Sequence, residues 1–211
     1  MKLHRIAIVI ALLACIGCSN SDDDTAPDAG NGNGDADGSD GPFSVEMVTT
    51  VGTVTIGVTP SWSPIGAARF RELVDAGFYD EARFFRVVPG FVVQFGINGT
   101  PATQAMWTDR TIDDDPVVES NVRGYVTFAK SSLPNSRTTQ LFINYSDNSF
   151  LDDSGFSPFG VVRSGGMDAI DDINSEYGEQ PSQELITNQG NAYLDENFPN
   201  LDSITTARIA P

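Results

Sequence analysis

Histidine and cysteine are almost missing from this chain of 211 residues, which holds one histidine and two cysteines. All three lie among the first eighteen residues, at His4, Cys15 and Cys18. The rest of the chain therefore has no Ser-His-Asp or Cys-His catalysis, no Cys/His zinc site, no haem or iron–sulfur ligand and no internal disulfide. Chemistry there must come from arginine, carboxylates, hydroxyls, amides, aromatic rings, the backbone or the solitary Lys130.

Basic residues are also scarce, since 12 Lys and Arg stand against 29 Asp and Glu. The formal net charge is −17 and the sequence pI is near 4.1. Binding to nucleic acid requires a clustered basic surface. We therefore expect no nucleic-acid partner.

Residues 1–18 are predicted to be a signal for export. Lys2 and Arg5 precede an apolar run of nine residues, which is too short for a membrane span of about 20. The ending, LLACIGCS, resembles a bacterial lipoprotein signal, in which a small residue precedes an acylated cysteine. Either Cys18 or Cys15 is the acylation site, and the sequence does not decide between them. An ordinary cleaved signal with two incidental cysteines is the alternative.

Residues 19–42 are expected to form a disordered acidic tether. The segment SNSDDDTAPDAGNGNGDADGSDGP has no basic residue and no bulky apolar side chain, so it cannot offset the entropy cost of ordering. Its Asp residues lack the spacing of a calcium-binding loop. A coil of this length spans about 25–30 Å.

Residues 43–211 are expected to form one domain, mainly β. Short β-branched or aromatic runs predict strands at 45–50, 53–58, 84–88, 91–95, 124–128, 141–144, 159–163 and 204–209. A helix is predicted from Ser63, as N-cap, and Pro64 to a C-terminal Gly77, and another over 167–174. These elements indicate a closed antiparallel barrel with helices covering its ends.

Three ordered motifs resemble those of the cyclophilin family. The first is FFRVVPGFVVQFG at 84–96, the second is FAK at 128–130 followed by QLFIN at 140–144, and the third is FLD at 150–152 followed by FGVV at 159–162. The helix before them and the Gly77-Phe78-Tyr79-Asp80 region agree with the same family. The resemblance extends over residues 45–209 and implies a peptidyl-prolyl cis–trans isomerase that assists protein folding. It also implies the fold of that family, a closed eight-stranded antiparallel cyclophilin-like barrel with two capping helices.

The resemblance also implies a set of site residues. Arg86 matches the catalytic arginine of the family, and Gln94 matches the glutamine that orients it. Phe91, Phe142 and Leu151 match the floor and walls of the proline pocket, with Val92 where methionine is common. The remaining expected substrate-binding residues are Ala129 and Lys130, which match a segment that pairs with the substrate backbone, together with Gln140, Phe150 and Phe156. As Lys130 lies beside this site, it is expected to favour acidic substrates.

Three departures from the family pattern bear on these expectations. Phe150 stands where many eukaryotic members have Trp, so weak cyclosporin binding is expected. Phe156 stands where those members have His, which removes a titrating group from the pocket. The polar stretch 178–202 is an insertion near the C-terminus and includes residues 190–199. The sequence assigns no role to it.

Rival hypotheses and other expectations complete the prediction. Arg86 and Gln94 favour the enzyme over a non-catalytic binding module or holdase for proline-containing segments, and an assembly factor for one envelope complex is a third reading. Adjacent carboxylates, such as 113–115, are expected to be solvated, so neither a metal nor a cofactor is predicted. We expect proline-containing polypeptide clients, a monomer, and membrane contact through the lipid anchor only. The expected location is the bacterial cell envelope facing the periplasm, the outer membrane being favoured because no Asp follows either cysteine.

Overall fold

A computed structural model describes residues 41–211 of the chain. The predicted signal, both candidate acylation cysteines and nearly all of the predicted tether fall outside these residues. The description begins just before the first strand, which starts at Phe43.

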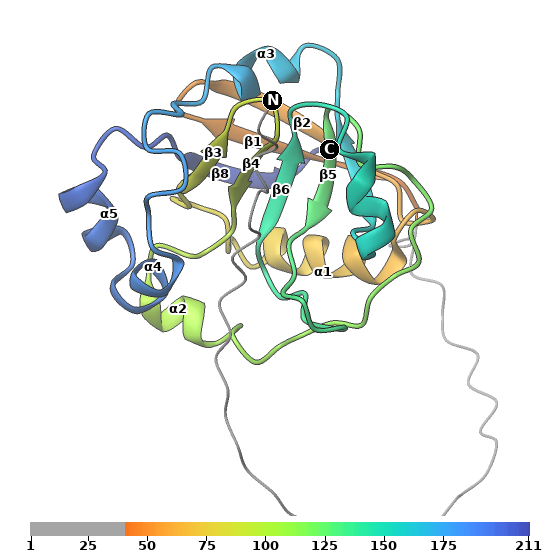
Figure 1. Cartoon of the computed structure of the whole chain (residues 1–211), viewed down its shortest axis with the longest axis horizontal. Helices are drawn as coiled ribbons and strands as arrows, with labels where there is room; N and C mark the ends of the chain where they lie inside the picture. Colours follow the sequence, from red (N-terminus) through yellow and green to blue (C-terminus); the bar gives the residue numbers. More distant parts are fainter. Residues whose placement is uncertain (1–40) are drawn as a thin grey trace, which may run out of the picture. The chain divides into compact units, whose positions relative to one another are not determined.

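Eight antiparallel strands form a single curled sheet, and each lies at or close to one of the β-branched or aromatic runs that predict strands (Figure 1). The order of neighbouring strands is β3-β4-β6-β5-β7-β2-β1-β8. Their bounds are β1 Phe43–Thr49, β2 Gly52–Val58, β3 Arg86–Val88, β4 Val92–Phe95, β5 Tyr125–Phe128, β6 Leu141–Asn144, β7 Pro158–Val162 and β8 Ile204–Ile209.

The prediction that the sheet closes into a barrel is wrong, because β3 and β8 remain its two edges. Only the segments just before these strands meet, through an isolated bridge between Arg83 and Ser203. Strand β3 is three residues long, and its Val87 N–H donates to the carbonyl of Gly178 at 3.1 Å. That hydrogen bond goes to the chain after the seventh strand instead of to β8, so the sheet stays open.

The first predicted helix, α1 (Pro64–Asp75), is present, but its N-terminus is capped differently from the prediction. The hydroxyl of Ser63 donates to Asp115 at 2.5 Å instead of accepting from the helix. The carboxylate of Asp115 accepts the N–H groups of Ile65 and Gly66 at 3.1 and 2.9 Å. A residue distant in sequence therefore caps α1. Gly77, with φ of 64°, follows the end of the helix, as predicted.

Besides α1 and the second predicted helix, found at α3 (Gly166–Asp171), the structure has three more short α-helices. The expectation of two helices is therefore wrong. The additional ones are α2 (Pro101–Ala105), α4 (Gln183–Gln189) and α5 (Asn191–Asn197), and a 3-10 helix η1 spans Ser149–Ser154. None of the helices in residues 41–211 has both the length and the apolar character needed to cross a membrane.

The main core lies between α1 and the concave face of the sheet. Phe70 and Leu73 of α1 are fully buried, and the ring centroids of Phe70 and of Phe159 on β7 are 4.9 Å apart. Alternate residues of β4 and β6 also enter this core, among them Val93 and Ile143. Their neighbours in sequence point to the other face, since side chains alternate along a strand.

The predicted insertion packs into a second apolar cluster beside β3. Its buried members are Phe85, Ile97, Ile186, Leu194 and Leu201, with Tyr177, Tyr193 and Phe198 packed against them. Helices α4 and α5 supply Ile186 and Leu194, so a stretch that is polar in composition still buries an apolar side. This cluster anchors residues 177–201 next to the residue that precedes Arg86.

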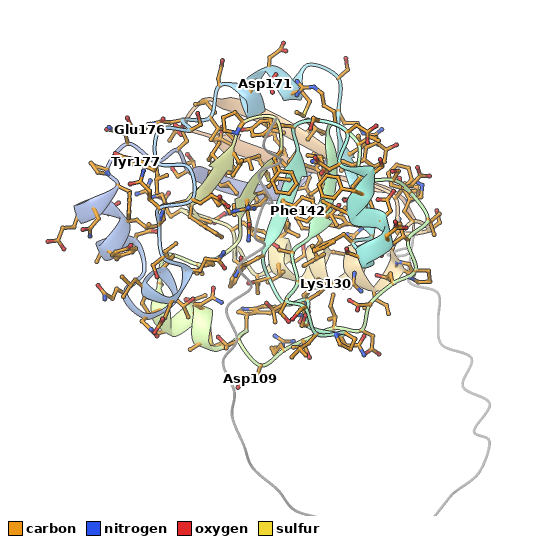
Figure 2. The ribbon with its side chains drawn as sticks, viewed as in Figure 1. Asp109, Lys130, Phe142, Asp171, Glu176 and Tyr177 are labelled. Atoms are coloured by element: carbon orange, nitrogen blue, oxygen red, sulfur yellow. The ribbon has the colours of Figure 1, made fainter. Side chains whose placement is uncertain are left out.

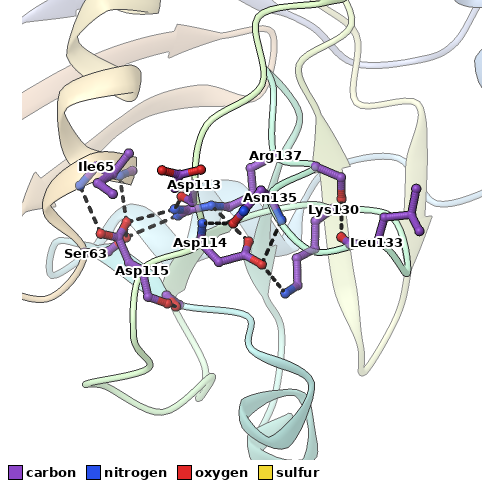
Figure 3. A network of polar contacts seen from close by, with 12 residues as sticks. Ser63, Ile65, Asp113, Asp114, Asp115, Lys130, Leu133, Asn135 and Arg137 are labelled. Atoms are coloured by element: carbon purple, nitrogen blue, oxygen red, sulfur yellow. Dashed lines mark hydrogen bonds and ion pairs between the residues drawn. The ribbon is translucent and has the colours of Figure 1, made fainter. Parts of the chain in front are cut away.

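Two of the three adjacent carboxylates at 113–115, those of Asp114 and Asp115, take part in a polar network, which corrects the sequence interpretation for these two (Figure 3). Asp113 is exposed, as expected, and only its backbone carbonyl joins the network, by accepting from Arg137. Asp115 is 5 % exposed and pairs with Arg137 at 3.0 Å. Asp114 accepts from Lys130 at 3.2 Å. Within residues 41–211, no group of three or more acidic, histidine or cysteine side chains is arranged to hold a metal ion.

Candidate active site

Strand register places the main candidate residues in one row across the outer face of the sheet. Arg86 of β3 pairs with Gln94 of β4, Gln94 pairs with Phe142 of β6, and Phe142 pairs with Thr127 of β5. Because side chains alternate, Val92 lies on the same face as Gln94. Phe142 of this row is labelled in Figure 2.

The polar side chains of this row form a hydrogen-bonded chain. Nη1 of Arg86 donates to Oε1 of Gln94 at 3.3 Å. Nε2 of Gln94 donates to Oε1 of Gln140 at 2.8 Å. Gln94 is only 8 % exposed, so its amide holds one orientation between two partners. The Arg86 guanidinium is thereby steadied at the edge of the sheet.

An apolar cluster adjoins the polar row. Its buried members are Val92, Phe142 and Leu151, with Phe91, Ala129 and Phe156 packed against them. The rings of Phe142 and Phe156 meet edge to face with centroids 5.7 Å apart. The Arg86 guanidinium lies 5.5 Å from the centre of the Phe91 ring. A permanent charge therefore borders an apolar surface, which strengthens its electrostatic effect on anything bound there.

The 3-10 helix η1 buries one of two neighbouring site residues, Leu151, and exposes the other, Phe150. Leu151 is 6 % exposed and lies in the apolar cluster, whereas Phe150 is 60 % exposed. The Phe150 ring nevertheless stacks on Phe91, with centroids 6.1 Å apart and planes 17° apart. Phe150 therefore extends the aromatic surface outward.

The structure places Lys130 at the border of the site but gives its charge a partner (Figure 3). Its Nζ lies 3.2 Å from Asp114 and 5.6 Å from the centre of the Phe156 ring, and the side chain is 10 % exposed. An ammonium that is partly buried and paired does not support the expected preference for acidic substrates. The neighbouring Ala129 N–H donates to the Gln140 carbonyl at 2.9 Å, so this N–H already has a partner within the protein.

A buried amide network under the apolar cluster was missed by the sequence interpretation. Asn121, Asn144 and Asn148 are at most 2 % exposed. Nδ2 of Asn148 donates to the Phe91 carbonyl at 2.9 Å, and Nδ2 of Asn121 donates to the Phe156 carbonyl at 2.8 Å. The network therefore fixes the backbone on both sides of the cluster. Asn121 and Asn148 lie in loops, where asparagine resembles an ordinary turn residue, and Asn144 ends a predicted strand, so no local signal shows that the three form one network.

Asp152 fastens η1 to this network. It accepts from Ser120 at 2.5 Å and from the backbone and side chain of Asn121 at 2.9 and 2.7 Å. Desolvation acts to raise the pKa of Asp152, but these hydrogen bonds outweigh it and hold the pKa below its usual range. A charged Asp152 therefore keeps Leu151 in place.

Glu179 is another residue without a sequence signal. Its Oε1 accepts from Nε of Arg86 at 2.7 Å, although the two residues are 93 positions apart. Glu179 lies in the chain segment between α3 and α4, which runs beside β3 (Figure 2, where its neighbours Glu176 and Tyr177 are labelled).

Comparisons with known proteins show which family the chain resembles. Residues 44–191 match the family model described as "Cyclophilin type peptidyl-prolyl cis-trans isomerase/CLD". A peptidyl-prolyl cis-trans isomerase of Acinetobacter baylyi is 35 % identical over 142 residues, which cover 64 % of this chain and 75 % of the relative. Peptidyl-prolyl cis-trans isomerase A of Dickeya dadantii is 31 % identical over 152 residues, covering 67 % and 80 % of the two chains.

Solved structures share the fold. A cyclophilin type peptidyl-prolyl cis-trans isomerase of Cryptosporidium parvum superposes with a TM-score of 0.61 at 20 % identity and covers 81 % of this chain and 98 % of its own. A cyclophilin of Hirschia baltica has a TM-score of 0.61 at 21 % identity, covering 80 % of this chain and 73 % of its own. The eight-stranded architecture is therefore that of these proteins.

Proposed function

Because this chain belongs to the cyclophilin family of peptidyl-prolyl cis–trans isomerases, we propose that it rotates X–Pro bonds at Arg86 and the adjoining apolar cluster. The observation that carries this assignment is the cross-strand pair of Arg86 and Gln94, which holds a guanidinium beside the Phe91 ring. A surface that only bound proline would have no use for an oriented charge at this point.

The chemistry of the reaction suits these residue types. Rotation about a peptide bond costs about 18–20 kcal/mol because resonance between the nitrogen and the carbonyl is lost. In the twisted state the prolyl nitrogen regains a lone pair, which can accept a hydrogen bond. Only interactions that are stronger in the twisted state than in the planar states raise the rate. The Arg86 N–H groups can supply such a bond without transferring a proton, so neither histidine nor cysteine is needed.

The apolar cluster supplies the second requirement, a hold on the proline ring. Phe142 is 5 % exposed and is braced by Phe156, so its ring offers a fixed face. Phe91 is braced by the stacked Phe150 on one side and bordered by Arg86 on the other. While the proline ring is held, the residue before the proline rotates about the X–Pro bond, close to the guanidinium. A cyclophilin structure from C. parvum obtained in the presence of the dipeptide Ala-Pro supports a proline-containing peptide as the occupant.

The clients, on this proposal, are exported polypeptides. Residues 1–18 have the pattern of a lipoprotein signal and residues 19–42 that of an acidic tether, which together would hold the isomerase domain at a membrane facing the periplasm. The alternative is a non-catalytic proline-binding module or holdase in the same place.

Cis–trans exchange of an X–Pro peptide, measured by NMR, tests the proposal. Addition of the protein should make exchange rapid, and Arg86→Ala should lower kcat/KM by about 10²-fold or more, the cost of removing one preorganised donor. Arg86→Lys is the matched control, since it keeps the charge and loses the planar fork. Slow exchange with peptide shift changes in both the protein and the Arg86→Ala variant would establish the binding module instead.

A further inference from the structure

One carboxylate contacts the guanidinium on which the proposed function depends. Oε1 of Glu179 accepts from Nε of Arg86 at 2.7 Å and lies 2.5 Å from Nη2 of the same side chain. Gln94 occupies Nη1. The guanidinium is therefore held from two sides, by a carboxylate at one edge and an amide at the other, and its plane is set before any substrate binds.

The backbone around Glu179 is fixed independently of this ion pair. The Gly178 carbonyl accepts from the Val87 N–H at 3.1 Å, directly beside Arg86 in β3. Gly178 has φ of 55°, a conformation that glycine adopts without strain, and it lies between two turn hydrogen bonds. Tyr177 packs edge to face on Phe198, with centroids 5.2 Å apart, in the second apolar cluster. Removal of the Glu179 side chain should thus leave the segment in place.

The ion pair has little value as a stabilising contact. The Glu179 side chain is 62 % exposed and that of Arg86 is 25 % exposed, and pairs exposed to this degree add little to the free energy of unfolding. Its effect must therefore lie in the orientation of Arg86. A long flexible side chain acts well on a transition state only when its orientation is set in advance.

We propose that Glu179 is a positioning residue for the isomerase reaction, which holds the Arg86 guanidinium at the angle needed to donate to the twisted X–Pro bond. This inference rests on the proposed function, which makes Arg86 the catalytic group. It also assigns a role to the insertion at 178–202, because the second apolar cluster and the Gly178–Val87 hydrogen bond carry the carboxylate to the site.

Kinetics of three variants of the full chain test the proposal. Glu179→Ala should lower kcat by about three- to thirtyfold with little change in KM, a smaller effect than the roughly 10²-fold of an ångström-scale misplacement. Glu179→Gln keeps a carbonyl oxygen that can accept from Nε, so it should restore part of the rate. Glu176→Gln is the control, because it removes one negative charge from the same segment at a carboxylate that accepts from Asn200 at 2.8 Å, not from Arg86.

The NMR signal of the Arg86 Nε–H reports the orientation directly. Its cross-peak, assigned by its loss in Arg86→Ala, should shift and broaden in Glu179→Ala and stay unchanged in Glu176→Gln. An unchanged signal and an unchanged kcat in Glu179→Ala would overturn the proposal, as would an equal loss of kcat in Glu176→Gln. If Arg86→Ala itself turns over peptide as fast as the unaltered protein, the catalytic assignment fails; if only Glu179→Ala does, the positioning role alone fails.

Discussion

Arg137 and Asp115 form an ion pair at 3.0 Å in which the side chains are 2 % and 1 % exposed. Arg137 lies just before β6 and Asp115 in the long connection before β5, so the pair ties together the two segments that flank Lys130 (Figure 3). Since Asp115 also accepts the first N–H groups of α1, one carboxylate joins a helix, a loop and a buried guanidinium.

We predict that removal of the Asp115 charge destabilises the protein strongly. Asp115→Ala should lower the free energy of unfolding by about 3–5 kcal/mol, because it removes the nearest carboxylate from the buried Arg137 charge and leaves it with the more distant Asp114, whose Oδ1 lies 3.5 Å from Nε of Arg137. Denaturant titration measures this value. Asp113→Asn is the control, as it removes a charge from the same run at an exposed position and should change stability by less than about 0.5 kcal/mol. Equal effects of the two substitutions would contradict a special role for Asp115.

Stability should also depend on pH through Asp115. Desolvation acts to raise the pKa of this carboxyl, but the hydrogen bonds from Ser63, Gly66 and Ile65 and the charge of Arg137 hold the pKa below its usual range. Its contribution to stability is therefore complete above the unfolded pKa of about 3.9 and is lost as the pH falls through the lower folded value. The free energy of unfolding, measured from pH 6 to pH 2, should fall less steeply in Asp115→Asn. An identical slope would refute the prediction.

Two phenylalanines of the site should separate binding from stability. Phe142→Ala empties a position that is 5 % exposed and should cost about 3–5 kcal/mol of stability, whereas Phe150→Ala, at 60 % exposure, should cost less than about 0.5 kcal/mol. Both should raise KM for an X–Pro peptide, since both rings face the proposed substrate surface. Thermal unfolding and isomerase kinetics on the same samples compare the two effects. A normal KM in Phe150→Ala would remove that ring from the site.

Asp114 should mask the charge of Lys130 from substrates. Peptides with Glu or Lys next to the proline should be turned over at similar rates by the unaltered protein at low salt. Asp114→Asn removes the carboxylate that lies 3.2 Å from the Lys130 ammonium, and should raise the rate for the Glu peptide by about two- to fivefold, the value of a partly exposed charge pair. The gain should disappear in Asp114→Asn combined with Lys130→Gln. A preference for the Glu peptide in the unaltered protein would instead support the expectation that Lys130 selects acidic substrates.

The predicted lipid anchor can be tested at its two candidate positions. Cells that express the full chain and are fed an alkyne-tagged fatty acid should label the protein. Cys18→Ser or Cys15→Ser should abolish this label, and the other substitution should leave it intact. Retention of the label in both single variants with loss in the double variant would mean that either cysteine can serve. Absence of the fatty-acid label from the unaltered chain would instead favour the alternative, an ordinary cleaved signal peptide with two incidental cysteines.

Local sequence was enough to predict which segments are strands, whereas the site residues were named through the resemblance to the cyclophilin family. Runs of β-branched and aromatic residues at 84–88, 91–95 and 141–144 predicted strands, and the hairpin at Pro89-Gly90 brings Arg86 opposite Gln94 only eight residues later. These are local relationships, since the period of a strand and the length of a turn are set by neighbouring residues.

The relationships between distant polar side chains emerged only from the packing of the folded chain. Glu179 reaches Arg86 across 93 positions, and Asp115 caps α1 from 49 and 50 positions away. In a sequence these acids look like any others in a polar loop, because nothing nearby shows whether a carboxylate will meet water or a guanidinium. The sheet also stays open through a contact between distant segments, because the Val87 N–H on the edge strand β3 donates to the Gly178 carbonyl instead of to β8. Each outcome depends on which segment packs there, and that is a property of the three-dimensional arrangement.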